Sequence, residues 1–220
     1  MTTVQDPCRQ SLSSLFERCL AAQYIDVENS ASYALEREGD HLHLLFQWSR
    51  GKNDWENNLD FPARPYRDMG KTWYCHRGFL RVWRSVRPYL HDAVHDPSVN
   101  CITVTGYSHG AALAALAHEY VWFERPDLRG GGIRGFGFGA PRVYWGLCMD
   151  PDLRQRWLDF TVVRNGKDIV TYLPPIILGY RHVGRILQIG HSQDGITDHR
   201  PESYKDALHE YESRCCHYFA

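Results

Sequence analysis

A serine between two glycines is the part of this sequence best suited to chemistry. The letters GYSHG place Gly106 and Gly110 on either side of Ser108, in the pattern GxSxG. A β-rich run, 101–105, precedes the motif, and an Ala- and Leu-rich run of helical character, 111–121, follows it. This context predicts a sharp strand-to-helix turn that exposes the serine hydroxyl and needs small neighbours. The alternative is an ordinary turn whose serine caps the helix.

A serine hydroxyl becomes a good nucleophile only beside a histidine base that a carboxylate orients. Asp168 follows Ser108 by 60 residues, at the end of the β-like run 160–164. His199 follows Asp168 by 31 residues, before the last helical run. This order of serine, acid and histidine is the one expected when the motif is a nucleophile elbow. Two alternatives remain open, a loop-capping role for Asp168 and His182 as the base.

Two further groups are candidates for stabilising an oxyanion. The backbone N–H of His109 lies at the expected start of the helix, where free N–H groups and the helix dipole favour negative charge. Ser49 is the second candidate donor, through its backbone N–H with its hydroxyl assisting, and its alternative role is that of a turn serine. Candidate substrate-binding residues are the aromatic side chains Trp48, Tyr66, Trp73 and Tyr107.

Strand-like and helix-like runs alternate along most of the chain. We expect a hairpin over 32–48, further strands at 101–105, 133–138, 160–164 and 183–189, and helices at 11–24, from 79 to 90, 111–121, 151–158 and 201–214. Alternation of this kind predicts an α/β domain with a mostly parallel central sheet flanked by helices. No repeat or linker divides residues 1–220, so one domain is expected.

Residues 49–75 are rich in Gly, Pro and aromatic residues and are expected to be irregular. Long loops in compact domains are usually functional or mobile, so this region is a candidate lid over a substrate pocket. Packing of its aromatic side chains onto the core is the alternative. The region has no helical stripe of large aliphatic residues, which favours soluble or short- to medium-chain esters as much as fat droplets.

Five ordered segments resemble those of the class 3 (fungal-type) lipases, esterases with the α/β-hydrolase fold. The serine segment at 104–114, VTGYSHGAALA, is similar to that family's nucleophile elbow. The others are similar to its oxyanion segment, its HxGF element, its FGxPRV element, and its acid-bearing loop with the following GYxHxG; they are FQWSRGKNDW (46–55), HRGF (76–79), FGFGAPRV (136–143), and NGKDIVTYLPP with GYRHVG (165–184).

The resemblance implies Ser108, Asp168 and His199 as the catalytic residues of an ester hydrolase that forms an acyl-enzyme. The family carries a histidine without a catalytic role at the position of His182. The sequence departs from the family where Gln47 and Trp48 replace Arg-Gly, and where His109 and Ala111 replace Leu and Gly. A non-catalytic binding module with this fold and an acyltransferase with the same triad are the alternative functions.

The composition of the chain disfavours some classes of binding partner. With 25 Lys and Arg against 26 Asp and Glu, the net charge of −1 disfavours nucleic-acid binding and electrostatic docking on anionic membranes. No apolar stretch is long enough for a membrane span. The first residues do not resemble a secretory signal, and seven cysteines, an odd number, suggest reduced thiols and a cytoplasmic protein. The expected partner is an ester or acylglycerol; no cofactor or metal is expected, and the oligomeric state is undetermined.

Overall fold

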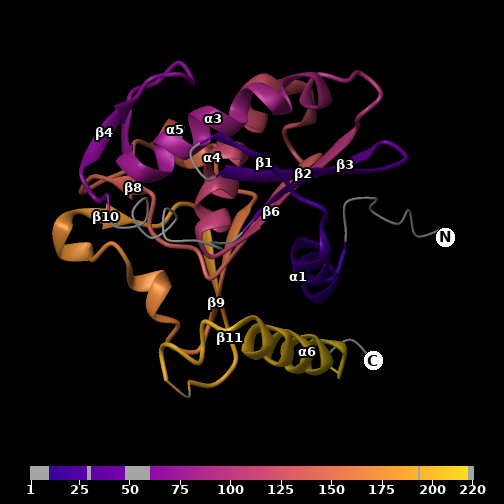
Figure 1. Cartoon of the computed structure of the whole chain (residues 1–220), viewed down its shortest axis with the longest axis vertical. Helices are drawn as coiled ribbons and strands as arrows, with labels where there is room; N and C mark the ends of the chain where they lie inside the picture. Colours follow the sequence, from indigo (N-terminus) through magenta and orange to yellow (C-terminus); the bar gives the residue numbers. More distant parts are fainter. Residues whose placement is uncertain (1–9, 29–30, 48–59, 193, 218–220) are drawn as a thin grey trace.

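Seven strands form the central sheet in the part of the chain that the structure describes (Figure 1). The structure is a computed structural model that describes residues 10–28, 31–47, 60–192 and 194–217. The strands lie in the order β1-β2-β3-β6-β7-β9-β11. The pairs β1–β2 and β2–β3 are antiparallel, and all later neighbours are parallel. Their bounds are β1 Ile25–Val27, β2 Ala31–Glu38, β3 His41–Phe46, β6 Cys101–Tyr107, β7 Ile133–Phe138, β9 Phe160–Asn165 and β11 Arg185–Ile189.

The composition of the central strands explains their position. Every residue of β3 and of β6 is buried. Parallel strands that helices cover on both faces are buried along their whole length, which is why their sequences are rich in apolar residues. The α/β prediction is therefore confirmed.

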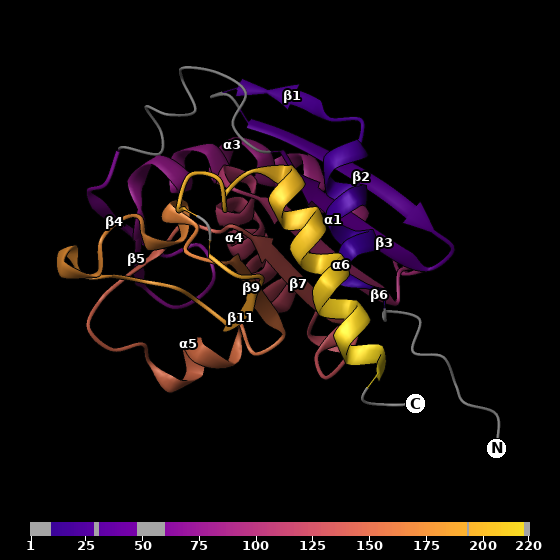
Figure 2. The ribbon, with the colours of Figure 1, turned by 90° about the horizontal axis from the view of Figure 1, so that it is seen from below.

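Helices cover both faces of this sheet (Figure 2). Helix α3 (Arg77–Val94) and helix α4 (His109–Glu124) share the larger apolar core with one face. Helix α1 (Leu12–Ala21) and helix α6 (Pro201–His217) lie side by side over the other face, around Phe16 and Tyr204. Helix α5 (Pro151–Gln155) ends earlier than the expected run 151–158.

A second, antiparallel sheet lies beside the first. Its order is β10-β8-β5-β4, with bounds β4 Ala63–Tyr66, β5 Trp73–His76, β8 Tyr144–Trp145 and β10 Tyr180–Arg181. Residues 49–59 of the candidate lid lie outside the described residues. The rest of that region was expected to be irregular, and this is wrong, because β4 and β5 pair with each other and β5 pairs with β8.

Short 3-10 turns connect some of the longer elements. η2 (Pro126–Leu128) lies between α4 and β7, and η3 (Ile169–Tyr172) and η4 (Ile176–Leu178) follow β9. Among the described residues, no helix combines the length and the apolar character that crossing a bilayer demands.

Candidate active site

Ser108 occupies a strained turn between β6 and α4. Its φ is 56° and its ψ is −121°, and it is the one non-glycine residue with positive φ in the described ranges. Such a conformation costs on the order of 1–3 kcal/mol. The Ser108 N–H donates a hydrogen bond of 2.9 Å to the carbonyl of Phe138 on the neighbouring strand, which helps to hold the turn. The predicted sharp strand-to-helix turn is present.

The two glycines around this serine permit close backbone packing. A Cβ atom on Gly106 would lie 2.2 Å from the carbonyl oxygen of Gly110, and one on Gly110 would lie 2.2 Å from that of Phe46. No side chain fits at such distances. Glycine at both positions therefore allows the first turn of α4 to pack directly against the ends of β6 and β3.

A chain of hydrogen bonds joins Ser108 to His199 and Asp168. The distance from Ser108 Oγ to His199 Nε2 is 2.9 Å, and the distance from His199 Nδ1 to Asp168 Oδ2 is also 2.9 Å. The carboxylate accepts a hydrogen bond from Nδ1–H, so Nε2 of the neutral ring is free to accept the serine proton. The Asp168 side chain is fully buried, whereas that of His199 is 21% exposed. This arrangement can activate a serine hydroxyl at a solvent-accessible position.

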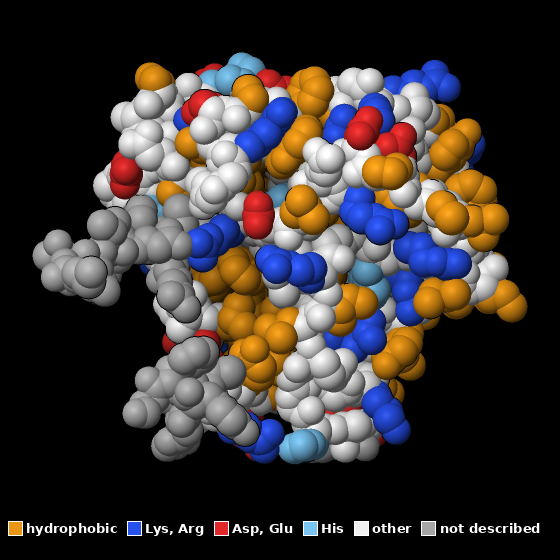
Figure 3. All heavy atoms as spheres, turned by 180° about the vertical axis from the view of Figure 1, so that it is seen from behind, with side chains coloured by type: hydrophobic (Ala, Val, Ile, Leu, Met, Phe, Trp, Pro, Cys, Tyr) orange, Lys and Arg blue, Asp and Glu red, His pale blue; other side chains and the backbone are white. Residues whose placement is uncertain are grey.

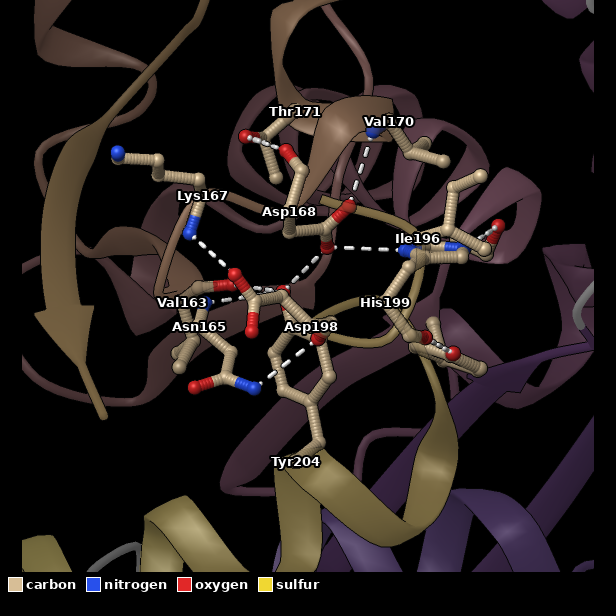
Figure 4. A network of polar contacts seen from close by, with 12 residues as sticks. Val163, Asn165, Lys167, Asp168, Val170, Thr171, Ile196, Asp198, His199 and Tyr204 are labelled. Atoms are coloured by element: carbon tan, nitrogen blue, oxygen red, sulfur yellow. Dashed lines mark hydrogen bonds and ion pairs between the residues drawn. The ribbon is translucent and has the colours of Figure 1, made fainter. Parts of the chain in front are cut away.

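The carboxylate of Asp168 receives further donors that orient it (Figure 4). Its Oδ2 accepts a hydrogen bond of 2.6 Å from the hydroxyl of Tyr204, and its Oδ1 accepts one of 2.9 Å from the N–H of Val170. Burial and the nearby Asp168 charge raise the pKa of Tyr204 well above its usual value, so its hydroxyl remains a donor. The sequence analysis did not identify Tyr204 as a partner of Asp168. The one indication in the sequence was that Tyr204 follows His199 by five residues, within the expected helix.

The loop that carries His199 is fastened on both sides. Buried Asp198 accepts a hydrogen bond of 2.8 Å from the N–H of Lys167, and its carbonyl accepts one of 3.0 Å from the Asn165 side chain (Figure 4). The Tyr107 hydroxyl donates to the carbonyl of His199, and the two rings stack with centroids 5.2 Å apart. The imidazole is therefore held in place by packing and by backbone contacts.

His182, the rival base, lies in a different environment. Its Nε2 is 2.8 Å from the carbonyl oxygen of Thr171. Burial, with smaller contributions from the charges of Arg142 and Arg164, lowers the pKa of His182 to about 4. Nε2 of His182 is engaged by this backbone carbonyl, and the buried ring is therefore better suited to a structural role than to proton transfer.

Of the two candidate oxyanion donors, His109 lies within the described residues and Ser49 does not. The backbone N–H of His109 belongs to the first turn of α4, where N–H groups lack acceptors within the helix. The buried imidazole of His109 packs edge-on against Phe79, with ring centroids 5.4 Å apart. Ser49 and Trp48 lie outside the described residues.

Two of the predicted substrate-binding aromatics lie in the core. Tyr66 is fully buried and accepts a hydrogen bond of 3.0 Å from the indole N–H of Trp83. The indole N–H of Trp73 is 3.1 Å from both oxygens of buried Glu119. Because these side chains are enclosed by protein, the structure contradicts their placement on a substrate pocket. Tyr107 is buried too, and it contacts His199 rather than open space.

Comparisons with known proteins show the family to which this sequence is similar. The family model described as Lipase (class 3) matches residues 43–178, well over half of the chain. A lipase of Rhizomucor miehei is 27% identical over 184 residues, which cover 80% of this chain and 47% of the relative. A secreted mono- and diacylglycerol lipase 1 of Fusarium solani is 31% identical over 134 residues, or 59% and 38% of the two chains. The chain thus spans less than half the length of these relatives.

Solved structures show the same fold. The triacylglyceride lipase of Rhizomucor miehei superposes with a TM-score of 0.62 at 24% identity, covering 76% of this chain and 66% of that chain. A triacylglycerol lipase whose catalytic centre is formed by a serine protease triad gives a TM-score of 0.63 at 20% identity, covering 78% and 66%. The expected α/β-hydrolase fold is confirmed.

The expected cytoplasmic location is wrong. Relatives from Fusarium solani and Malassezia restricta are named as secreted lipases. Cys101 is disulfide-bonded, whereas Cys19, Cys75 and Cys148 are free, so the expectation that all thiols are reduced is wrong as well. The odd number of cysteines was a poor guide, because one pair suffices to form a disulfide.

The strained serine turn, the hydrogen-bonded Ser108, His199 and Asp168, and the match over 43–178 lead to one assignment. The chain belongs to the class 3 lipase family.

Proposed function

We propose that this chain hydrolyses carboxylic esters, with Ser108 as nucleophile, His199 as general base and Asp168 as the acid that orients it. The observation that carries the proposal is the continuous hydrogen-bond chain of 2.9 Å and 2.9 Å that begins at a serine on a strained turn. A turn serine that merely caps a helix would need no such partners. Ser108 also makes no side-chain hydrogen bond to the helix that it precedes.

The reaction follows from these positions. Ser108 Oγ attacks the ester carbonyl as its proton moves to His199 Nε2, and a tetrahedral oxyanion forms. The imidazolium, stabilised by Asp168, then donates that proton to the departing alkoxide, which leaves as an alcohol. Water attacks the resulting acyl-enzyme by the same route in reverse, releases the carboxylic acid and restores the serine.

The first turn of α4 supplies positive charge where the oxyanion develops. The N–H of His109 is the proposed first donor, and that of Ser49 is the proposed second. Losing one such donor typically costs about 2.7–4 kcal/mol of transition-state stabilisation.

Acylglycerols are the proposed substrates, because the Fusarium and Malassezia relatives are named as mono- and diacylglycerol lipases. The same relatives and the disulfide-bonded Cys101 support an extracellular location. The two sheets and their helices are proposed to act as one catalytic domain.

A fluorophosphonate probe tests the nucleophile directly. The wild-type chain is expected to be labelled at Ser108 and to hydrolyse p-nitrophenyl esters, and the Ser108→Ala variant is expected to do neither. A wild-type chain that is not labelled and has no more activity than this control would instead be a binding module. Product analysis with a competing alcohol separates hydrolysis from acyl transfer, since a transferase would form mainly the new ester.

Paired histidine variants test the base. His199→Ala is expected to abolish turnover, because no other base contacts Ser108 Oγ in the described residues. His182→Ala is expected chiefly to lower stability, since its ring contacts the Thr171 carbonyl. The opposite ranking would assign the base role to His182.

A further inference from the structure

A groove of about 790 Å³ lies between α3 and β4, which are neighbours in the fold (Figure 1). Four arginines line it, Arg64 from β4 and Arg77, Arg81 and Arg84 from α3. Of its described lining residues, Glu28 alone is acidic, and none belongs to the candidate active site. The groove is therefore a concave surface with an excess of positive charge, in a chain whose net charge is −1.

The arginines of α3 form a regular row. Arg77, Arg81 and Arg84 follow one another at intervals of four and three residues, which places them on one face of the helix. At a rise of about 1.5 Å per residue, the row extends roughly 10 Å along the helix axis. The planar fork of a guanidinium matches the paired oxygens of a carboxylate or sulfate group. This spacing favours an elongated ligand that carries several such groups.

Two carboxylates hold arginines of the row in place. Asp60 accepts a hydrogen bond of 2.9 Å from Arg77 Nε. Asp68 lies 3.3 Å from Nη2 of Arg84 and 2.9 Å from Nη1 of Arg87, the next arginine along the helix. Each guanidinium has five N–H donors, and these contacts use only some of them. The ion pairs therefore fix the guanidinium groups and leave donors for a ligand.

The carboxylates do not cancel the positive charge of this region. Arg81 Nη1 lies 3.6 Å from Asp60, so this carboxylate is shared by two arginines, as Asp68 is. Arg64 forms no ion pair with any residue in the described parts of the chain. With Glu28 included, three carboxylates line the groove or pair with its arginines, against five arginines. An excess of two positive charges remains to attract an anion.

The other side chains of the groove favour a sugar chain over a peptide. The ring of Tyr89 lines the groove, is 54% exposed, and is held by stacking on Tyr33 with centroids 5.8 Å apart. An exposed aromatic face in a fixed position suits packing against the C–H groups of a sugar ring. A peptide would gain most by pairing with the edge of β4. That strand has four residues, and one of them, Pro65, has no N–H to donate.

We propose that this groove binds an anionic polysaccharide, a sugar chain that carries sulfate or carboxylate groups. The arginine row and Arg64 contact the charged groups, Tyr89 packs against a sugar ring, and Glu28 opposes binding by repulsion. The site goes beyond the proposed ester hydrolysis, because it shares no lining residue with Ser108 and its partners. Binding there would anchor the chain to a charged polymer while the candidate active site stays free.

Isothermal titration calorimetry with defined oligosaccharides tests the proposal. A heparin hexasaccharide supplies sulfate groups, a galacturonic acid hexasaccharide supplies carboxylates alone, and maltohexaose is uncharged. The wild-type chain is expected to bind at least one anionic hexasaccharide, with an affinity that falls as salt is added, and not to bind maltohexaose. The tighter of the two identifies the charged group. Binding to neither, or tighter binding to a hexaglutamate peptide, would overturn the proposal.

Matched variants locate the binding surface. Arg64→Gln is expected to weaken hexasaccharide binding about threefold, and Arg64→Gln with Arg81→Gln about tenfold. Tyr89→Ala is expected to weaken it about threefold, whereas Glu28→Gln is expected to strengthen it about threefold, because repulsion is removed.

Arg185→Gln is the control, since Arg185 is exposed and lies at the start of β11, outside the groove. Such a control is needed because Lys and Arg side chains also occur elsewhere on the surface, as Figure 3 shows. It is expected to change hexasaccharide binding little. If it weakens binding as much as Arg64→Gln does, or if Glu28→Gln does not strengthen binding, the groove is not the site.

Circular dichroism and fluorophosphonate labelling accompany each variant, to show that the fold and the candidate active site are intact. Labelling of a wild-type chain that binds no hexasaccharide would reject the polysaccharide site and leave the proposed hydrolase function intact. Hexasaccharide binding by a wild-type chain that is never labelled would support the polysaccharide site and reject the hydrolase.

Discussion

Two buried carboxylates, Asp168 and Glu119, have different partners in this protein. Both side chains are fully buried. Asp168 is bonded to His199, whose ring is part-exposed and reaches Ser108. Glu119, on α4, is bonded to the guanidinium of Arg156 at 2.6 Å and to the indole of Trp73.

The difference lies in the partner's ability to move a proton. An arginine remains charged and the indole only donates, so neither partner of Glu119 can accept a proton from it, although burial raises the pKa of Glu119 to about 7. An imidazole can gain and lose a proton near neutral pH. Burial of a carboxylate therefore does not identify a catalytic site; a titratable partner in contact with a nucleophile does.

Replacing Asp168 with Asn is expected to have the largest effect on activity. The amide would favour the wrong tautomer of His199, and kcat should fall about 10⁴-fold, as such changes do in serine enzymes. Ester hydrolysis measured beside the unfolding midpoint in urea distinguishes this from misfolding. A variant with near wild-type kcat would remove Asp168 from its proposed role.

The sequence predicted the central sheet and the serine turn well, because both depend on local signals. Continuous apolar runs such as 101–105 mark buried parallel strands, and Gly106 and Gly110 mark a close backbone approach. Asp168 and His199 were predicted from chain order and family resemblance, and their hydrogen bonds agree with that prediction.

The sequence did not predict which aromatics would be buried. Tyr66 and Trp73 occur among Gly and Pro residues and looked like loop residues, yet they are partners across the β4–β5 pair and pack against each other. Tyr204 was missed for a related reason. Its contact with Asp168 depends on how α6 docks on the sheet, which no local pattern specifies.

Replacing Glu119 with Gln should affect stability rather than chemistry. The buried Arg156 would lose its ion pair, and breaking such a pair typically costs about 3–5 kcal/mol. We expect urea unfolding to report a loss of this size while kcat per folded molecule stays near that of the wild type. A large fall in kcat with little loss of stability would erase the distinction between the two carboxylates.

His118, the residue next to Glu119, is expected to make the stability of the protein depend on pH. Burial lowers its pKa from 6.5 to about 4, so the folded protein keeps the ring neutral. The unfolded chain binds a proton near pH 6.5; the residue's contribution to stability is therefore complete above that pH and is lost as pH falls toward 4. The loss amounts to roughly 3 kcal/mol.

The variant His118→Gln, which does not titrate, should flatten this part of the dependence. Urea unfolding of both proteins from pH 7 to pH 4 measures it. Parallel curves for the two proteins would show that His118 does not contribute to acid sensitivity.

Tyr204→Phe is expected to have the smallest effect and to sharpen the comparison most. The variant removes the donor 2.6 Å from Asp168 Oδ2 while keeping the buried ring. A hydrogen bond to a charged group is worth about 1.5–3 kcal/mol, and because Tyr204 acts through Asp168 and His199, we expect kcat/KM to fall about tenfold. The freed carboxylate should hold the imidazolium more strongly, so the acidic limb of the kcat/KM profile should move to higher pH.

Tyr66→Phe is the matched control, since it also removes a buried hydroxyl, one bonded to Trp83 and away from the triad. It is expected to lower stability without moving the pH profile. If Tyr204→Phe behaves in the same way, Tyr204 supports the fold only. If its pH profile shifts, Tyr204 is a positioning residue. Asp168 then differs from Glu119 also in its hydrogen-bond donors, which set how strongly it stabilises a protonated histidine.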